Sequence, residues 1–317
     1  MKADVIVVDV GGTKTRLGAL RDGVPLAAFS TLKSRDFDGT QGAPHAVLAA
    51  VISRFANSHQ LNMNALVVGI PGMLDERRER ISQCNNVPAL EGLSLIQGLR
   101  AALDVPVVFE QDIMLQLLGE WRCGVAQNRD SVFGLYFGTG IGSAWLQGGD
   151  PFLPRSTCQQ AGHIPVGMVG LKCKCGKYDC VEAHASGHTL LALAQQHRVP
   201  IDAMFEHRGN AALDEDLQRF VTWQAFLVTT IGMLFEPDMI VIGGGIPGMP
   251  GYPRQRLIDI VGGQLQSSSA FNPDRLGFAV LAEEAPVFGA RALVEHLGSS
   301  TDSHAMANGR FPLDHRR

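Results

Sequence analysis

One local pattern occurs in both halves of the sequence: an apolar strand, a glycine turn and a second strand. In the first half, residues 5–10 and 16–20 are the predicted strands, and residues 11–13 form the turn. In the second half, the strands are predicted at 132–137 and 141–147, on either side of another glycine turn. Helical periodicity between these strands predicts an α/β chain with duplicated lobes.

The chain of 317 residues is long enough for two lobes, each with its own apolar core. We expect an N-terminal α/β lobe at 1–118, to which a closing helix near 288–300 returns. The C-terminal α/β lobe is expected at 119–287 and carries a cysteine-rich loop. A further strand is predicted at 25–29, and the polar residues 301–317 are expected to form a loose tail.

Glycine turns at strand ends are typical of phosphate-binding loops, because glycine lets backbone N–H groups approach phosphate oxygens closely. Thr13 and Thr139 can add hydroxyl donors. A single turn of this kind is more often only a turn, but three of them favour a nucleotide site. Neither the Walker sequence nor the dinucleotide fingerprint is present. The glycines concerned are Gly11, Gly12, Gly138, Gly140, Gly243, Gly244 and Gly245.

Two aspartates follow predicted strands and are candidates for chemistry. Asp9 ends the first strand, where its carboxylate could hold Mg²⁺ against phosphates or could merely stabilise its turn. Asp112 begins a helix after the strand at 105–109. It could act as a helix cap, or as the general base that accepts a proton during phosphoryl transfer.

The densest motif is H-x9-C-x-C-x4-C, formed by His163, Cys173, Cys175 and Cys180, with Glu182 two residues beyond it. One imidazole and three thiolates are a complete ligand set for tetrahedral zinc. Because this set leaves no open coordination position, we predict a structural metal that presents neighbouring side chains to a ligand. The remaining cysteines are scattered and are expected to be reduced.

These motifs together resemble the ROK family of sugar kinases and related repressors. The resemblance implies the two-lobed, actin-like and ribonuclease-H-like ATPase fold, with a cleft between the lobes. Within the family, DIMLQLLGEW, AGHIPVG and GGGIPGMPGYPRQRL resemble kinases of D-allose, which makes D-allose the first candidate sugar. The matching stretches are DVGGTKTR (9–16), GIPG (69–72), NVP (86–88), FGTGIG (137–142), AGHIPVG (161–167), CKCGKYDCVE (173–182) and VIGGG (241–245).

The resemblance also implies roles for individual residues. Asp112 would deprotonate a sugar hydroxyl, with transfer of the γ-phosphoryl group of ATP to O6, and the active protein would be a homodimer. The ligands of structural zinc would be His163, Cys173, Cys175 and Cys180. The ATP phosphates and nearby nucleotide would contact Thr13, Lys14, Gly138, Thr139, Gly140 and Gly244. The sugar would contact Gly72, Asn86, Asp112, His163 and Glu182.

The chain departs from the family pattern near the expected sugar contacts. The family usually has Asn on both sides of the catalytic aspartate, whereas this chain has Gln111 and Met114. Three residues before the zinc histidine, Gln160 replaces a glutamate; its amide can still bond a sugar hydroxyl but carries no charge. Asp179 replaces a glycine before the last cysteine. These changes leave the identity of the sugar open.

Two other functions compete with the kinase. A family repressor would carry a DNA-binding region ahead of the first phosphate turn; here that turn starts at Asp9 and the net charge is −4, so no nucleic-acid partner is expected. Gln160 and Met114 also suit a catalytically impaired sugar binder. The apolar runs are strand-sized, so no membrane association is expected. No signal peptide is recognisable, and we expect a cytoplasmic protein.

Overall fold

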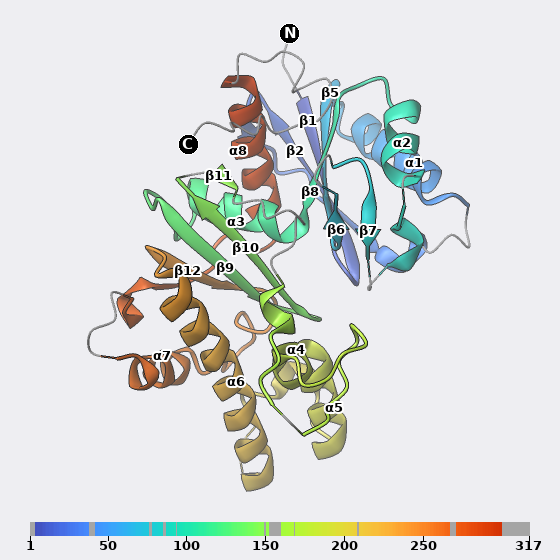
Figure 1. Cartoon of the computed structure of the whole chain (residues 1–317). Helices are drawn as coiled ribbons and strands as arrows, with labels where there is room; N and C mark the ends of the chain where they lie inside the picture. The colour runs from blue at the N-terminus through green and yellow to red at the C-terminus, as the bar shows by residue number, and fades with distance from the viewer. Residues whose placement is uncertain are drawn as a thin grey trace. The chain divides into compact units, whose positions relative to one another are not determined.

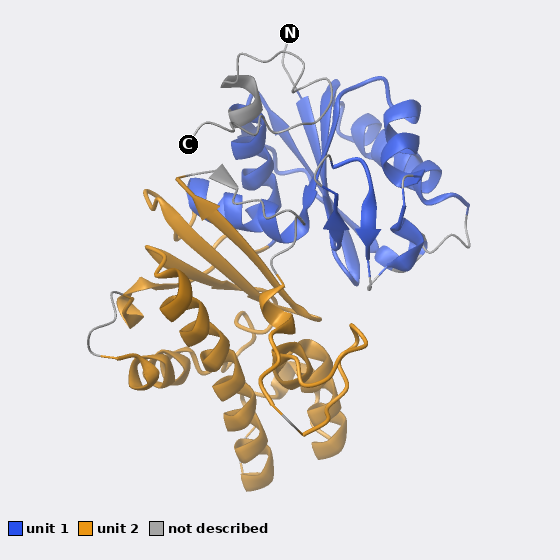
Figure 2. Cartoon of the chain, in the orientation of Figure 1, with its two compact units in different colours: residues 1–123, 153–158, 283–317 blue, residues 124–152, 159–282 orange. Residues whose placement is uncertain are grey.

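The computed structural model in Figure 1 divides the chain into two compact units, coloured separately in Figure 2. Unit 1 contains the described residues within 1–123 and 283–317, and unit 2 contains those within 124–152 and 159–282. The structure describes residues 4–37, 42–75, 78–84, 87–92, 94–148, 150–151, 160–167, 169–207, 209–266 and 271–299.

Unit 1 is built on a sheet with the strand order β3-β2-β1-β5-β8, and β4 pairs with β2. The neighbours β1, β5 and β8 run parallel, whereas β2 is antiparallel to β1. Parallel strands place their carboxyl ends at one edge, where ligands commonly bind in α/β proteins. The strands are β1 (Asp4–Val10), β2 (Lys14–Arg21), β3 (Val24–Pro25), β4 (Ser30–Lys33), β5 (Met63–Ile70) and β8 (Val107–Gln111).

Two pairs of helices accompany this sheet. Helices α1 (Pro44–Ser58) and α2 (Ser94–Ala102) lie together on one side, and α3 (Asp112–Cys123) and α8 (Ala285–Ser299) lie together on the other (Figure 1). Helix α1 forms because its apolar residues recur at helical spacing and are buried in the core of unit 1. A two-stranded hairpin, β6 (Met73–Leu74) and β7 (Ile81–Gln83), completes the unit.

The boundary between the units follows the end of α3 and not residue 118, where we expected it. Helix α3 is continuous to Cys123 and packs along α8, so the whole helix belongs to unit 1. Two glycines permit this close packing: a Cβ atom on Gly119 would overlap the Ala285 carbonyl, and one on Gly289 would overlap the Leu115 carbonyl. The returning segment begins at residue 283, a few residues before the expected helix.

The strand predicted at 25–29 is wrong as a continuous element. The chain pairs with β2 through β3 at Val24–Pro25, leaves the sheet, and pairs again through β4 at Ser30–Lys33. The Leu26 N–H still donates to the Ala19 carbonyl at 2.9 Å, but no strand follows until Ser30, and Phe29 is exposed at 43%. The apolar run therefore crosses the surface between two short strands.

Unit 2 has a five-stranded sheet in the order β11-β10-β9-β12-β13. Strands β9, β12 and β13 are parallel, so the glycine turns after β9 and β12 lie at the same edge. The strands are β9 (Ser131–Phe137), β10 (Ile141–Gln147), β11 (Asp150–Pro151), β12 (Met239–Gly243) and β13 (Leu276–Phe278). The helices are α4 (Val181–Ala185), α5 (Gly187–His197), α6 (Ala211–Phe235) and α7 (Arg254–Gln264).

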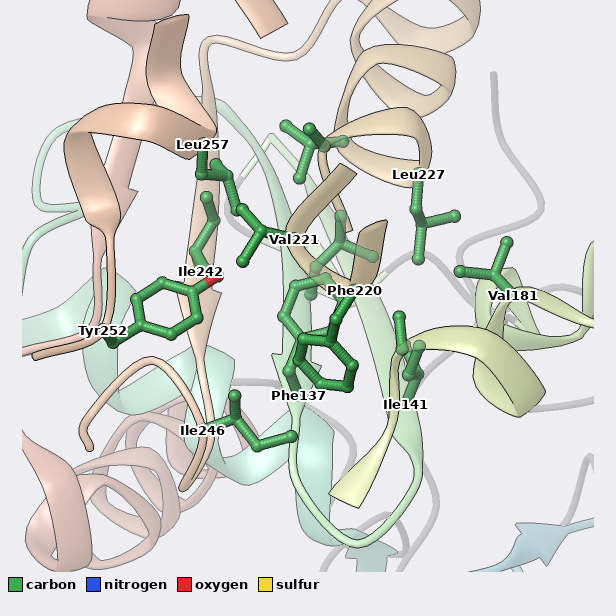
Figure 3. Packing of buried hydrophobic residues seen from close by; sticks show 14 of the residues in the cluster. Phe137, Ile141, Val181, Phe220, Val221, Leu227, Ile242, Ile246, Tyr252 and Leu257 are labelled. Atoms are coloured by element: carbon green, nitrogen blue, oxygen red, sulfur yellow. The ribbon is translucent and has the colours of Figure 1, made fainter. Parts of the chain in front are cut away.

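One apolar core joins this sheet to its helices. Figure 3 shows Phe220 of α6 beside Phe137 of β9, with Ile141 and Val181 in the same cluster. Phe137 and Ile141 flank the turn at 138–140, so both ends of that turn are anchored in the core. Among the described residues, no helix combines the length and the apolar character needed to cross a bilayer.

Candidate functional site

The parallel strands of unit 1 bring Asp9 and Asp112 to one sheet edge. Asp9 lies opposite Gly69 in the β1–β5 register, and Asp112 directly follows β8. A Cβ atom on Gly69 would lie 3.3 Å from Asp112 Cα and 3.5 Å from Asp9 Oδ1. The same Cβ atom would lie 2.9 Å from Leu115 Cδ1, so Gly69 lets the start of α3 approach β5, a role that its place in GIPG did not reveal.

Asp112 is the first residue of α3, and its Oδ1 accepts the N–H of Ile113 at 2.8 Å. Its side chain retains some exposure, yet desolvation raises the pKa of its carboxyl well above the ordinary value. The charge of Asp9 raises this pKa further. A carboxylate with raised proton affinity is suited to accept a proton from a hydroxyl group. The position of Asp112 at the start of α3 is therefore compatible with a role as general base.

Asp9 is 6% exposed, and its Oδ1 has no hydrogen-bond partner among the described residues. Burial raises the pKa of this carboxyl to about 6, although Arg16, 3.8 Å away, lowers it. A buried carboxylate oxygen without a partner is costly unless a cation or another donor satisfies it. This orphaned oxygen beside a glycine turn fits a Mg²⁺ ligand better than a residue that only stabilises its turn.

The first glycine turn is held by its own strand and by one serine. The N–H of Gly11 donates to the Lys14 carbonyl at 2.9 Å. Ser34 donates its N–H to the Thr13 carbonyl at 3.0 Å and its hydroxyl to the Gly11 carbonyl at 2.6 Å. Thr13 and Lys14 are exposed, so they are accessible to a ligand. The contribution of Ser34 had no signal in the sequence, because a single serine is uninformative.

The second and third glycine turns are neighbours in unit 2. A Cβ atom on Gly244, whose φ is +93°, would overlap the Phe137 carbonyl, which accepts the N–H of Ile246 at 3.0 Å. Gly245 is exposed beside it, as is Thr139 in the second turn. Gly243 is buried, and a Cβ atom there would lie 2.5 Å from the Tyr136 ring. Gly243 therefore serves packing, whereas Gly244 and Gly245 face solvent.

The structure brings together the four residues of the cysteine motif in unit 2. Their ligand atoms all lie within 4.8 Å of one another. Cys175 Sγ is 3.8 Å from Cys180 Sγ, and Cys173 Sγ is 3.8 Å from His163 Nδ1. Ligand atoms around tetrahedral zinc are separated by about 3.5–3.8 Å, given its usual bond lengths. The donor set and its spacing therefore fit a structural zinc ion.

Asp179 stabilises the loop that carries these ligands. Its φ is +56°, a left-handed conformation that explains why glycine is usual at this place. The carboxylate accepts the N–H groups of Gly170 and Leu171 at 3.0 and 2.9 Å. Aspartate tolerates this conformation better than most residues, and here it adds two hydrogen bonds to the loop.

Two departures from the family pattern have structural explanations in unit 1. Gln111 donates from Nε2 to the Gly72 carbonyl at 3.1 Å, so it fastens the loop at Gly72 to the end of β8. Met114 is 2% exposed and packs in the buried face of α3, where it offers nothing to a ligand. A Cβ atom on Gly72 would lie 2.5 Å from the Gln83 carbonyl, which excludes any side chain there. Asn86 lies outside the described residues.

The remaining expected sugar contacts belong to unit 2. Gln160 is exposed, and its carbonyl accepts the N–H of His163 at 2.9 Å. Glu182 Oε1 lies 4.0 Å from His163 Nδ1, while Oε2 accepts the N–H of Ile141 at 2.8 Å. Unit 2 thus gathers Gln160, His163 and Glu182 around the cysteine motif, and unit 1 holds Gly72 and Asp112.

Known proteins similar to this chain include sugar kinases. N-acetyl-D-glucosamine kinase of Escherichia coli O127:H6 is 29% identical over 265 residues, which cover 78% of this chain and 86% of that protein. The crystal structure of a ROK hexokinase from Thermus thermophilus is 26% identical, with a TM-score of 0.75, and covers 91% of this chain and 97% of its own.

A ROK family transcriptional regulator, a homologue of an E. coli protein, shares the fold with a TM-score of 0.78 at 18% identity. The match covers 97% of this chain and 79% of the regulator. At this identity the likeness concerns the fold and not the function. Residues 5–296 match the ROK family itself. The chain therefore belongs to the ROK family and has its two-lobed, actin-like α/β ATPase fold.

Proposed function

We propose that this ROK family sugar kinase transfers the γ-phosphoryl group of ATP to the primary hydroxyl at O6 of a hexose, with D-allose as the first candidate. The observation that carries the proposal is the edge of unit 1, where a glycine turn, an orphaned Asp9 oxygen and a desolvated Asp112 carboxylate come together. These are the parts that phosphoryl transfer needs: phosphate donors, a cation ligand and a base.

In this reaction Asp112 accepts the proton of the sugar hydroxyl while the new O–P bond forms and the bond to the ADP oxygen breaks. Its raised pKa increases its affinity for that proton, and Asp9 beside it contributes to the shift. Asp9 would hold Mg²⁺, which neutralises phosphate charge when bound. The N–H groups of the glycine turns and the exposed Thr13 and Thr139 would bind phosphate oxygens.

The cysteine motif would bind one structural zinc ion through His163, Cys173, Cys175 and Cys180. All four positions of a tetrahedral ion would then be filled by protein, so the metal would take no part in the chemistry. Its role would be to order the loop that leads into Glu182. Burial raises the pKa of the Cys173 thiol to about 12, so metal binding must release its proton.

The choice of sugar rests on D-allose-like stretches of sequence and is tested against other hexoses. The relatives named above act, by their names, on N-acetyl-D-glucosamine and on hexoses. Gln160 offers an amide where the family usually has a carboxylate, which changes the hydrogen bonds available to a sugar hydroxyl. The panel should therefore contain D-allose, D-glucose, D-mannose and their acetylated amino derivatives.

Two alternatives remain within the same fold. A sugar-responsive regulator can have the same fold, as the ROK transcriptional regulator does, so the fold alone does not separate it from a kinase. A sugar binder with impaired catalysis is favoured by Gln160 and by the buried Met114. Both alternatives predict sugar binding without turnover, which separates them from the kinase.

The deciding experiment supplies purified protein with Mg²⁺–ATP and each sugar of the panel, and follows ADP release. We expect one hexose to stimulate release strongly and to yield its 6-phosphate. Sugar binding by calorimetry without stimulated release from any sugar would contradict the kinase. Elemental analysis of the same preparation should find about one zinc per chain, and light scattering should find a homodimer.

A further inference from the structure

The two oxygens of the Glu182 carboxylate contact different parts of unit 2. Oε2 accepts the N–H of Ile141, the residue that directly follows the second glycine turn, at 2.8 Å. Oε1 faces the cysteine motif, 3.6 Å from Cys173 Sγ and 4.0 Å from His163 Nδ1. A single side chain therefore joins the expected metal site to the expected nucleotide turn.

The turn at 138–140 is shaped around this contact. A Cβ atom on Gly140 would lie 2.5 Å from Glu182 Oε2, so a side chain there would displace the carboxylate from this contact. At the other end, Gly187 donates its N–H to the Gly138 carbonyl at 2.8 Å, and a Cβ atom on Gly187 would lie 2.7 Å from that oxygen. Both anchoring residues follow Cys180 by seven residues or fewer.

The segment that carries His163 is fastened to the same strand. A Cβ atom on Gly162 would lie 2.6 Å from the Ile141 carbonyl, and Ala161 donates its N–H to Ser143 Oγ at 3.2 Å. Val181 is fully buried in the core that also contains Ile141 (Figure 3). The residues on both sides of the cysteine motif thus pack against β10 and its turn.

The loop between these segments has little apolar core of its own. Along residues 169–180, the buried residues are Cys173, Asp179 and Cys180, whereas Val169 is 77% and Tyr178 is 58% exposed. A loop without apolar burial gains little from folding to offset its conformational entropy. A metal bound by its cysteines would supply that stabilisation.

We propose that Glu182 is a positioning residue for the nucleotide. A metal bound by the cysteine motif orders the loop at 169–180, and Glu182 then holds the turn at 138–140 in place. The metal therefore strengthens ATP binding independently of the sugar. The inference rests on the proposed nucleotide site and adds to the sugar contact expected of Glu182. Its physical basis is the hydrogen bond from Ile141 to a partly buried carboxylate, together with the close approach of Gly140.

The test measures binding of AMPPNP, a non-hydrolysable ATP analogue, by calorimetry with Mg²⁺ and without sugar. Loss of a hydrogen bond to a charged group predicts that Glu182→Ala weakens binding about tenfold. In Glu182→Gln the amide oxygen can still accept the Ile141 N–H, so binding should stay within about threefold of wild type. Stripping zinc with a chelator should weaken wild-type binding by about tenfold and leave Glu182→Ala almost unchanged, because the link is already broken.

Glu215→Ala is the matched control, because Glu215 is a strongly exposed glutamate of the same unit, on α6. It should bind AMPPNP as wild type does, with and without zinc. Hydrogen exchange on wild-type protein gives a measurement that needs no variant. Removal of zinc should increase exchange at the amides of Ile141 and Gly187, while the amides of Gly11 and Ser34 in unit 1 should not change.

Each outcome separates the inference from the proposed function. If wild type binds AMPPNP equally well with and without zinc, or if Glu182→Ala binds as wild type does, the inference is overturned and the kinase stands. A loss in Glu182→Gln as large as in Glu182→Ala also overturns the positioning role. If zinc-loaded wild type does not bind AMPPNP at all, the nucleotide site itself is wrong, and the inference is overturned with it.

Discussion

The first and second glycine turns occupy the same strand–turn–strand setting, but different contacts hold them in place. In unit 1, the turn at 11–13 is held by Lys14 on its own strand and by Ser34, which directly follows β4. In unit 2, the turn at 138–140 is held by Glu182 and Gly187, which follow a cysteine ligand. The same local motif is therefore independent of the metal loop in one unit and coupled to it in the other.

The two units also carry different kinds of candidate site residues. The carboxylates suited to proton transfer and cation binding, Asp112 and Asp9, both lie at the sheet edge of unit 1. The metal ligands and Glu182 lie in unit 2. Substitutions in unit 1 should therefore change catalysis or stability without changing the zinc content, and the predictions for Asp112, Arg78 and Ser34 test that separation.

The largest effect is expected for Asp112→Asn. The amide cannot accept the hydroxyl proton, so turnover should fall by about 10²–10⁴-fold, the usual contribution of a general base. Sugar-stimulated ADP release measures this, and the zinc content and AMPPNP affinity should remain those of wild type. Turnover close to wild type would remove Asp112 from the mechanism.

The next largest effect is expected for Arg78→Met. Arg78 and Glu110 form a buried ion pair at 2.7 Å, with side-chain exposures of 3% and 0%. Removing one partner leaves a buried charge, which should lower the free energy of unfolding by about 3–5 kcal/mol.

Urea unfolding measures this loss, and the double variant Arg78→Met/Glu110→Leu should recover much of it. The zinc content should not change, because the pair lies in unit 1. A loss of zinc in folded Arg78→Met protein would contradict the independence of the two units.

An effect of intermediate size is expected for Asp9→Asn, which should increase stability where Arg78→Met decreases it. The pKa of Asp9 is about 6 in the folded protein and 3.8 in the absence of its surroundings. The folded state therefore binds more protons between these values, and its stability decreases as the pH rises from about 4 to 6.

The neutral amide removes this loss, so Asp9→Asn should be more stable than wild type at pH 7 by about 1–3 kcal/mol. Thermal unfolding at pH 4 and pH 7 checks this prediction. The gain should vanish at the lower pH, where wild-type Asp9 is largely protonated. An equal gain at both pH values would mean that the carboxylate is not the cause.

The smallest effect is expected for Ser34→Ala, the counterpart of Glu182→Ala in unit 1. It removes the hydrogen bond from Ser34 Oγ to the Gly11 carbonyl, which is worth about 1 kcal/mol. The KM for ATP should rise by about threefold, and by the same factor with and without zinc. If the increase in the KM for ATP depended on zinc, the proposed difference between the two turns would be wrong.

Much of the fold followed from local patterns. The apolar strands at β1, β9 and β10 and the helix that begins at Asp112 are confirmed, because side-chain periodicity and glycine turns act over a few residues. The strand at 25–29 was wrong because hydrophobicity there does not reflect pairing: β3 ends at Pro25, and β4 begins only at Ser30. The expected break at 118 fell inside a helix whose extent depends on packing against α8.

The candidate site shows the same difference between local features and contacts of distant segments. The spacing of the cysteines and the position of Asp112 after a strand were visible in the sequence, because ligand sets and strand ends are local features. The bonds between Glu182 and Ile141, Ser34 and Gly11, and Arg78 and Glu110 were not, because in each pair the two residues are more than twenty positions apart in the chain.

The sequence by itself determined the α/β class, the glycine turns, the four candidate metal ligands and the two aspartates, since all of these depend on residue type and short spacing. Only the tertiary structure decided that Asp9 and Asp112 both lie beside Gly69, that Gln111 holds the loop at Gly72, and that Glu182 joins the cysteine motif to a glycine turn. Hydrogen-bond partners and desolvation are set by packing between distant segments, and no local pattern encodes them.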